Sequence, residues 1–223
     1  MTENTASEEV YLSLKKRIIN GEFLPGVHLV EGDLAKDYPY SRVTIREALR
    51  RLVEDELVEL LPHRGIHVRK ISLRELKDLY LIMEYLTGLA ARLAAESSDI
   101  NTIRDLEKIY KEMVVSVENE DFDYKVELTL RFHRRILKDT GNNYLIRMVE
   151  RTQLISSLHY EVMPLKQRMK ASLESHRKIL DAIIARDADQ AEDLMRLHYR
   201  SAINLISDSF QKSEPVPVSY PAT

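Results

Sequence analysis

Three arginines, Arg42, Arg46 and Arg50, recur every four residues in the segment 40–52. In a helix, this spacing places all three side chains on one face, where they form a row of positive charge. A guanidinium group can bind phosphate oxygens, and it can also donate two hydrogen bonds to the O6 and N7 atoms of guanine. The row therefore predicts a surface that contacts nucleic acid, with a solvated helix face as the alternative.

The other face of this helix is apolar and predicts packing against a core. Ile45, Ala48, Leu49 and Leu52 follow the i, i+3, i+4, i+7 spacing of a buried stripe. Ser41 stands at the expected N-cap, which leaves the first backbone N–H groups and the positive helix end pointing outward. Because such a helix fits a phosphate-lined groove, we interpret it as a DNA recognition helix.

The flanking segments favour this interpretation over the solvated face. Residues 30–38 predict a short helix, and Pro39-Tyr40 predicts the tight turn that joins it to the arginine-bearing helix. The runs 58–61 and 66–69 have the composition of strands, and the segment 62–65 between them predicts a turn. Gly65 allows the positive φ that this turn needs. Together these elements predict a winged helix-turn-helix.

Several separated motifs of this region occur in the order typical of one family. They are Gly21–Glu31, Leu34-Ala35, Ser41-Arg42, Arg46–Leu49 and Arg64-Gly65. Over roughly residues 8–70, the chain resembles the DNA-binding domain of GntR-family bacterial transcription regulators. The resemblance implies that double-stranded DNA is contacted by Ser41, Arg42, Arg46, His63, Arg64 and Gly65. We expect Thr44 and Arg50 of the same helix to belong to this DNA-binding set as well.

Within this set the roles differ, and one position departs from the family. The resemblance implies that Arg42 and Arg46 read bases or lie beside the residues that do. For Arg50, we expect a phosphate contact or a surface charge. The family usually has a glycine in the turn of the helix-turn-helix, where this chain has Pro39. Proline fixes φ near −65° and cannot adopt the left-handed conformation of a glycine, so the turn geometry is open.

Composition limits the function classes further. The chain has 223 residues, enough for one large or two modest domains, and no cysteine, which excludes disulfides and thiolate metal sites. It has no long apolar run and no signal-peptide pattern, so we expect a cytoplasmic protein without membrane contact. The net charge of −3 argues against a charge-driven, non-specific binder of nucleic acid. It remains compatible with a dimer that reads sequence through a local basic surface.

The pattern of breaks predicts the domain organisation. We expect a disordered start over 1–7, the winged domain over 8–70, a helical domain over 71–210, and a disordered, proline-containing tail over 211–223. The residues Ser72 to Glu75 form a capping-box pattern that begins the helical domain. Six helical stretches and no strand pattern follow. The predicted fold class is mainly α, with an N-terminal winged helix-turn-helix and a C-terminal antiparallel bundle of about six helices.

Three histidines of the predicted bundle could converge. His176 lies about eleven residues before the predicted corner at Asp187-Ala188, and His198 lies about ten residues after it. At ~1.5 Å per residue, both rise ~15–17 Å from that corner in an antiparallel hairpin and can face each other. His133 lies on an earlier helix. Three imidazoles in a bundle suit a divalent transition metal, whereas the alternative is three separate polar residues at the surface or the core edge.

The second domain also resembles a known type. Phe132-His133, Ser175–Ile183 and Arg196–His198 resemble the FCD effector domain of the FadR-type GntR subfamily, over about residues 72–210. Six helices instead of seven indicate the smaller, VanR-like version. The resemblance implies that His133, His176 and His198 bind zinc or nickel, which receives a small carboxylate effector. The usual aspartate ligand is replaced by Thr129, a poor ligand that removes a negative charge, and some members hold an acyl-coenzyme A without a metal.

These observations predict a homodimeric, DNA-binding transcription regulator whose helical domain binds a small effector. Two winged domains would then bind the two half-sites of a palindromic operator. A metal-dependent enzyme is one alternative, although no general base is evident because Thr129 fills the expected carboxylate position. An adaptor that has lost DNA binding is the other alternative, and Pro39 in the turn is what allows it.

Overall fold

The computed structural model describes residues 3–97, 99–158 and 165–212. Over these residues the chain is mainly α-helical, with a small three-stranded sheet, as predicted. It forms two compact units: the first comprises Met1–Leu76 and Arg151–Glu161, and the second comprises Lys77–Glu150 and Val162–Thr223. The first unit thus extends past the predicted boundary near residue 70 and includes a segment that we had assigned to the helical domain. Among the described residues, no helix is long and apolar enough to cross a membrane.

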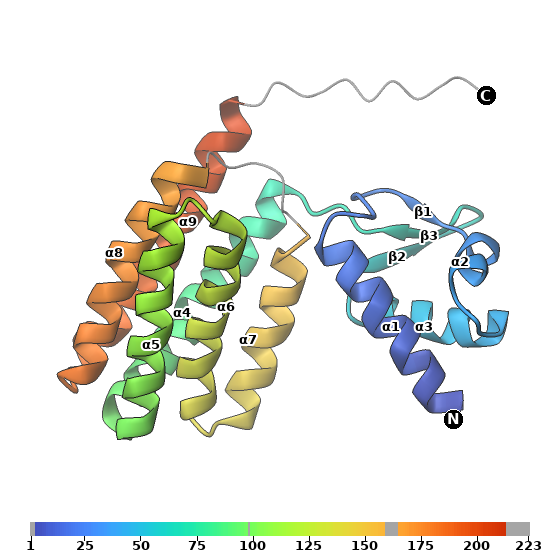
Figure 1. Ribbon diagram of the computed structural model, residues 1–223. Helices are drawn as coiled ribbons and strands as arrows, with labels where there is room; N and C mark the ends of the chain where they lie inside the picture. Colours follow the sequence, from blue (N-terminus) through green and yellow to red (C-terminus); the bar gives the residue numbers. More distant parts are fainter. Residues whose placement is uncertain (1–2, 98, 159–164, 213–223) are drawn as a thin grey trace. The chain divides into compact units, whose positions relative to one another are not determined.

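The first unit is a winged helix-turn-helix (Figure 1). Its sheet is antiparallel, with the strand order β1-β3-β2. The first strand was not predicted, because only two residues form it, of which His28 pairs with His67. The elements are α1 (Glu3–Ile19), β1 (His28–Leu29), α2 (Glu31–Asp37), α3 (Arg42–Glu54), β2 (Val58–Leu61) and β3 (Gly65–Val68).

The helix α1 begins earlier than expected. We predicted a disordered start over residues 1–7, but residues 3–7 belong to α1. The reason is burial: Ala6 and Ser7 are 8% and 5% exposed, so the first turns of α1 pack against the rest of the unit. Farther along α1, Leu14 is fully buried in the same core as Leu49 of α3. The apolar stripe of the recognition helix therefore packs against α1.

Pro39 is compatible with the turn between α2 and α3. Tyr38 ends α2 in an extended conformation, with φ −129° and ψ 141°. This conformation is the one favoured for a residue that precedes proline. The structure describes all residues between α2 and α3, and none of them has a positive φ. The turn is therefore closed without a left-handed glycine, and Pro39 does not disrupt the helix-turn-helix.

The wing turn has the predicted conformation. Gly65 has a φ of 81°, and His63 also adopts a positive φ, of 60°. The backbone N–H of Arg64 donates to the carbonyl of Leu61 at 3.1 Å, which closes the turn between β2 and β3. A Cβ atom on Gly65 would lie 2.6 Å from His28 Nε2, so a larger residue would have to displace the His28 ring in addition to adopting a strained positive φ.

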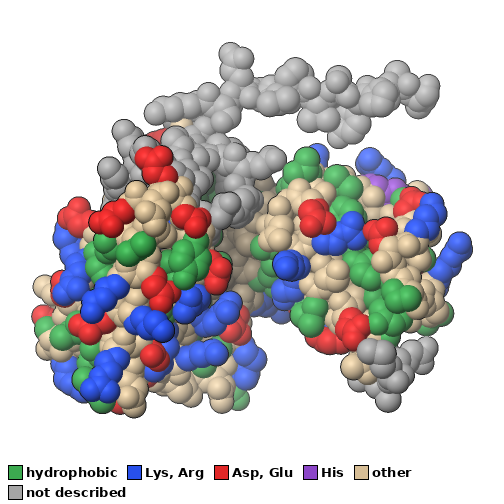
Figure 2. Space-filling model, in the orientation of Figure 1, with side chains coloured by type: hydrophobic (Ala, Val, Ile, Leu, Met, Phe, Trp, Pro, Cys, Tyr) green, Lys and Arg blue, Asp and Glu red, His purple; other side chains and the backbone are tan. Residues whose placement is uncertain are grey.

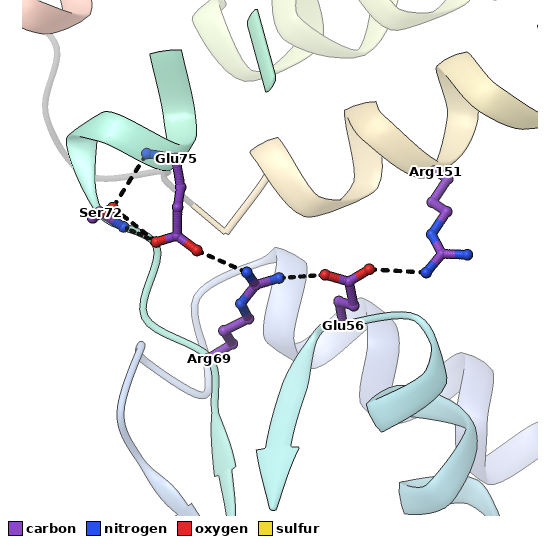
Figure 3. A network of polar contacts seen from close by, with 5 residues as sticks. All are labelled: Glu56, Arg69, Ser72, Glu75 and Arg151. Atoms are coloured by element: carbon purple, nitrogen blue, oxygen red, sulfur yellow. Dashed lines mark hydrogen bonds and ion pairs between the residues drawn. The ribbon is translucent and has the colours of Figure 1, made fainter. Parts of the chain in front are cut away.

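A chain of ion pairs belongs to the first unit and is drawn in Figure 3. Ser72 and Glu75 form the predicted capping box: Ser72 Oγ accepts from Glu75 N at 3.2 Å, and a carboxylate oxygen of Glu75 accepts from Ser72 N at 3.0 Å. Arg69 donates to Glu75 and to Glu56, each at 2.8 Å, and Arg151 donates to Glu56 at 2.8 Å. The network joins the start of α4 (Leu73–Ser97) and the late part of α7 (Asn143–Ser156) to the turn after α3.

The second unit is helical (Figure 1). Six helices follow the wing in the described residues, in the number predicted. The predicted disordered tail 211–223 lies outside the described residues, except that Gln211 and Lys212 end the last helix. The helices are α4 (Leu73–Ser97), α5 (Ile100–Glu118), α6 (Phe122–Asp139), α7 (Asn143–Ser156), α8 (Leu165–Ile184) and α9 (Ala188–Lys212).

Apolar side chains of neighbouring helices form one core in this unit. Leu106 of α5, Phe132 of α6 and Ile179 of α8 are fully buried in it. The alanines of α4, such as Ala91 and Ala94, are also fully buried, and their small side chains let neighbouring helices approach. On the face of this unit visible in Figure 2, basic and acidic side chains are intermixed, as expected from the small net charge.

Candidate DNA-binding surface and effector site

The first turn of α3 is held by the predicted N-cap. Ser41 Oγ accepts a hydrogen bond from Thr44 N at 3.2 Å and lies 2.9 Å from Thr44 Oγ1. Thr44 is only 5% exposed. The DNA contact expected of Thr44 stays a prediction, because in the free protein its hydroxyl belongs to the cap and its side chain is buried. Thr44 positions the helix start, while Ser41 stays exposed.

The three arginines of α3 are all exposed, but they differ in their partners. Arg46 forms a double contact with Glu31 of α2, at 2.9 and 3.0 Å, and this pairing lowers the pKa of the Glu31 carboxyl. Arg50 is paired with Glu47 and Glu54 on its own helix. Arg42 has no carboxylate within ion-pair distance among the residues that the structure describes. Arg42 is therefore the arginine of this row that is most available to a ligand.

One exposed residue of this surface was missed from the sequence. Val43 lies beside the arginine row on α3, and it is 65% exposed. In a major groove, an apolar side chain at this place could contact the methyl group of thymine. The available signal was its position: Val43 is adjacent to Arg42 and falls outside the i, i+3, i+4, i+7 stripe of buried residues.

The wing presents the second predicted group of DNA contacts. His63 and Arg64 are exposed at the tip, and Gly65 is partly exposed at the start of β3. The positive φ of His63 and Gly65 sets the direction in which the tip projects. A cationic side chain on a short loop can reach a phosphate or the minor groove beside the site of the recognition helix.

The three histidines of the second unit converge. His176 Nε2 lies 3.1 Å from His133 Nε2, and the ring centroids of His176 and His198 are 4.6 Å apart. One nitrogen from each ring lies within 4.8 Å of the others, so the cluster could hold a metal ion. His176 is fully buried, and His198 is partly exposed. The predicted facing of His176 and His198 across the α8–α9 hairpin is confirmed.

Hydrogen bonds fix the orientation of two of these rings. His176 Nδ1 lies 2.5 Å from the carbonyl of Ser172 and must donate to it, because a carbonyl only accepts. The Ser175 hydroxyl donates to the same carbonyl at 2.8 Å, so it accepts from His198 Nδ1, also at 2.8 Å. The neutral form of each ring then carries its lone pair on Nε2. His133 Nε2–H can donate to His176 Nε2.

Two imidazoles of the cluster, those of His133 and His176, are held in their neutral form. Burial lowers the pKa of His133 well below its usual range, and the charges of His198 and Lys125 lower it further. The pKa of His176 is lowered in the same way, first by burial and then by His198, His133 and Lys125. Neutral imidazole is the form that binds a metal ion or accepts a hydrogen bond.

Lys125 is a site residue that sequence reasoning missed. Its side chain is fully buried, and its ammonium donates to Thr129 Oγ1 at 2.7 Å. Thr129 in turn donates to the carbonyl of Lys125 at 2.9 Å. The available signal was spacing, because Lys125, Thr129 and His133 follow one another at intervals of four on α6.

The surroundings of the histidines do not suit a divalent cation, although the three imidazoles do. At the position where the resemblance implies an aspartate ligand, Thr129 supplies no carboxylate, and its hydroxyl accepts from the Lys125 ammonium. His133 Nδ1 is buried and has no hydrogen-bond partner among the described residues. A metal-bound His133 Nε2 would require a proton on this Nδ1, and metal ligands almost always donate that proton to an acceptor. The cluster thus offers three imidazoles to a metal ion, but among the described residues it lacks the carboxylate ligand and the hydrogen-bond acceptor for His133 Nδ1.

Comparisons with known proteins agree with this architecture. Residues 6–68 match the family described as bacterial regulatory proteins, gntR family, and residues 78–201 match the FCD domain. The chain is 28% identical over 193 residues to the uncharacterized HTH-type transcriptional regulator YdhC of Bacillus subtilis, covering 86% of each chain. It is 29% identical over 175 residues to the gluconate operon transcriptional repressor of Bacillus licheniformis, covering 77% of this chain and 70% of the relative.

A solved structure shows the same fold. The structure of Escherichia coli McbR/YncC matches with a TM-score of 0.77 at 20% identity, covering 93% of this chain and 98% of that one. At this level of identity, the likeness concerns the fold alone.

Proposed function

The chain belongs to the GntR family of bacterial regulatory proteins, with an FCD domain after its DNA-binding domain, and from this premise we propose that it is a homodimeric repressor. The family assignment makes it a DNA-binding transcription regulator with a ligand-binding domain; its relatives are regulators, not enzymes. Repression is proposed because a relative is named as a repressor. The place of action is then the bacterial cytoplasm, where the operator DNA lies.

The single observation that supports sequence-specific DNA binding is the exposed N-terminal part of α3. There Arg42 and Val43 are exposed beside a capped helix end, and the tip of the wing carries Arg64. We propose that Arg42 reads a base, that Arg46 does so after leaving Glu31, and that Arg50 contacts phosphate. Ser41, His63 and Gly65 complete the surface. An electrophoretic shift of DNA upstream of the protein's own gene tests this, and binding that is equal for unrelated DNA would contradict it.

The homodimer is supported by an exposed apolar stripe on α4. Leu81, Ile82, Tyr85 and Leu89 are 55%, 49%, 54% and 39% exposed and follow the spacing of one helix face. Exposed apolar residues at this spacing are a common dimer surface. Light scattering of the purified chain should give twice 26.0 kDa. Leu81→Glu should shift the protein to the monomer, and Leu12→Glu, at another exposed leucine, is the matched control.

For the effector, we propose a small carboxylate held at the histidine cluster. His133, His176 and His198 are buried or half-buried polar groups that converge inside an apolar core, as expected of a ligand site. The relative named for the gluconate operon makes sugar acids the first class to test. Gluconate should weaken operator binding by the intact protein, and a panel of carboxylates without any effect on it would contradict the proposal.

A zinc or nickel ion at these histidines stays a prediction of the family resemblance. Three neutral imidazoles are suitable ligands for either ion. Elemental analysis of tag-free protein purified without chelator measures it directly: one ion per chain that is lost in His176→Gln would support a metal site.

A further inference from the structure

A basic groove lies between α5 and α6 on the surface of the second unit. It has a volume of about 330 Å³, and it reaches down to Ile109, which is 7% exposed and belongs to the core. Lys and Arg side chains are visible over these two helices in Figure 2. Among the described residues, the lining contains one carboxylate, that of Asp105, and five cationic side chains, which are Lys108, Arg131, Arg134, Arg135 and Lys138.

The four cations that α6 contributes form one row. Residues 131, 134, 135 and 138 follow the i, i+3, i+4, i+7 spacing of a single helix face. This face is largely turned toward solvent, whereas His133 and Ile136 of the same helix are turned inward. The groove is therefore separate from the histidine cluster.

Carboxylates neutralise only two of the five cations. Arg135 pairs with Asp105 at 3.0 Å, and Arg131 pairs with Glu112 at 3.4 Å. Within the described part of the chain, no ion pair involves the other three cations, which are Lys108, Arg134 and Lys138. Two of these three lie four residues apart on α6, a spacing at which like charges destabilise a helix. Because the whole chain has a net charge of −3, this local excess of positive charge indicates an anionic ligand.

The number and type of the unpaired cations indicate a ligand with more than one negative group. The guanidinium of Arg134 can donate two parallel hydrogen bonds to a phosphate, and lysine ammonium groups bind phosphate as point charges. Because the groove is open to water, each ion pair contributes little, and a singly charged carboxylate would gain too little from it. A diphosphate group carries several charges on adjacent phosphates and can contact cations of both helices at once. The groove volume lies near the lower end of the range of small-molecule sites, about 300–1,000 Å³, and suits a compact anion.

We propose that the α5–α6 groove binds a small anion that contains a diphosphate group, either the free ion or a nucleotide. Arg134 and Lys138 hold the diphosphate from α6, and Lys108 holds it from α5. The ligand supplies the negative charge that these three side chains lack in the free protein. Because the groove is separate from the histidine cluster, this proposal does not depend on the proposed carboxylate effector.

The test measures diphosphate binding by the full-length protein and by two matched double variants. The groove variant, Arg134→Gln with Lys138→Gln, removes one arginine and one lysine from the groove. The control variant, Arg104→Gln with Lys111→Gln, removes the same two residue types from exposed positions of α5 that do not line the groove. Calorimetry at low salt in EDTA uses pyrophosphate, orthophosphate, ADP and a DNA duplex of unrelated sequence. Circular dichroism verifies that each variant is helical.

We expect one pyrophosphate to bind per chain, about fivefold or more tightly than orthophosphate. The groove variant should bind pyrophosphate about fivefold or more weakly than wild type, and the control variant should stay within about twofold of wild type. Tighter binding of ADP than of pyrophosphate would support the proposal with a nucleotide as the ligand, and weaker binding of ADP would support it with the free ion.

Two kinds of result would overturn the proposal. The first is the absence of pyrophosphate binding by wild type, or an equal loss of affinity in the groove variant and the control variant. The second is a groove variant that loses affinity for the DNA duplex alone, because the groove would then contact a DNA backbone and no small anion.

Discussion

Replacing Arg42 by alanine tests how the recognition helix reads DNA. Arg42 is exposed and has no ion-pair partner among the described residues, so binding DNA breaks no existing contact of this side chain. A bidentate contact with a guanine is worth about 1–3 kcal/mol at its own base pair. A symmetric dimer makes the contact twice, so the loss is about 2–6 kcal/mol. At 1.4 kcal/mol per tenfold change, operator affinity should fall roughly 30-fold or more.

The other two arginines provide matched controls on the same helix. Arg46 must leave Glu31, and breaking such an exposed pair costs about 0–1 kcal/mol, so Arg46→Ala should have a smaller effect than Arg42→Ala. Arg50 is already paired with Glu47 and Glu54, and Arg50→Ala should weaken binding no more than about fivefold.

The assay is fluorescence anisotropy with the operator and with each single-base variant of one half-site, at fixed salt. Arg42→Ala should lose discrimination at one position of the half-site. Two results would refute the reasoning: an equal loss of affinity for every sequence, which makes Arg42 a phosphate contact, or an equal loss in Arg50→Ala.

Three further predictions follow from individual contacts. Glu31→Gln releases Arg46 and should tighten operator binding about two- to fivefold in the same assay; weaker binding would show that Glu31 serves to orient Arg46. Ser41→Ala removes the N-cap of α3 and should lower the free energy of unfolding in urea by about 1 kcal/mol; an unchanged value would mean that the cap adds no stability. Arg200 lowers the pKa of the buried Glu84 carboxyl from 4.5, so the stability from this pair is present at neutral pH and is lost as the pH falls below that value. The stability difference between wild type and Glu84→Gln should therefore shrink below about pH 4.5, and a constant difference would contradict it.

The parts of the fold that could be predicted from the sequence are those determined by residues close together in the chain. The stripe from Ile45 to Leu52, the capping box at Ser72 and the glycine of the wing each act through neighbouring residues, so their spacing was sufficient. The strand β1 could not be predicted because two residues show no alternation, and it exists only through its pairing with β3. The early start of α1 likewise depends on burial against other elements.

The candidate sites show the same limit. The convergence of His176 and His198 was predictable because a helix hairpin relates the two positions by simple arithmetic. The pairing of Arg46 with Glu31 was not predictable, since it depends on the angle between α2 and α3. The buried ammonium of Lys125 was also missed, because a lysine in an amphipathic helix is ordinarily assigned to its solvated face.

The central claim is that a small carboxylate at the histidine cluster controls operator binding. The most direct measurement is the dissociation constant of the operator complex of the full-length protein with and without gluconate, galactonate or lactate, for wild type and for His198→Gln. The account predicts a change of about fivefold or more for wild type with at least one of these acids, and none for the variant. An operator dissociation constant that none of the three acids changes, or that changes equally in His198→Gln, would contradict it.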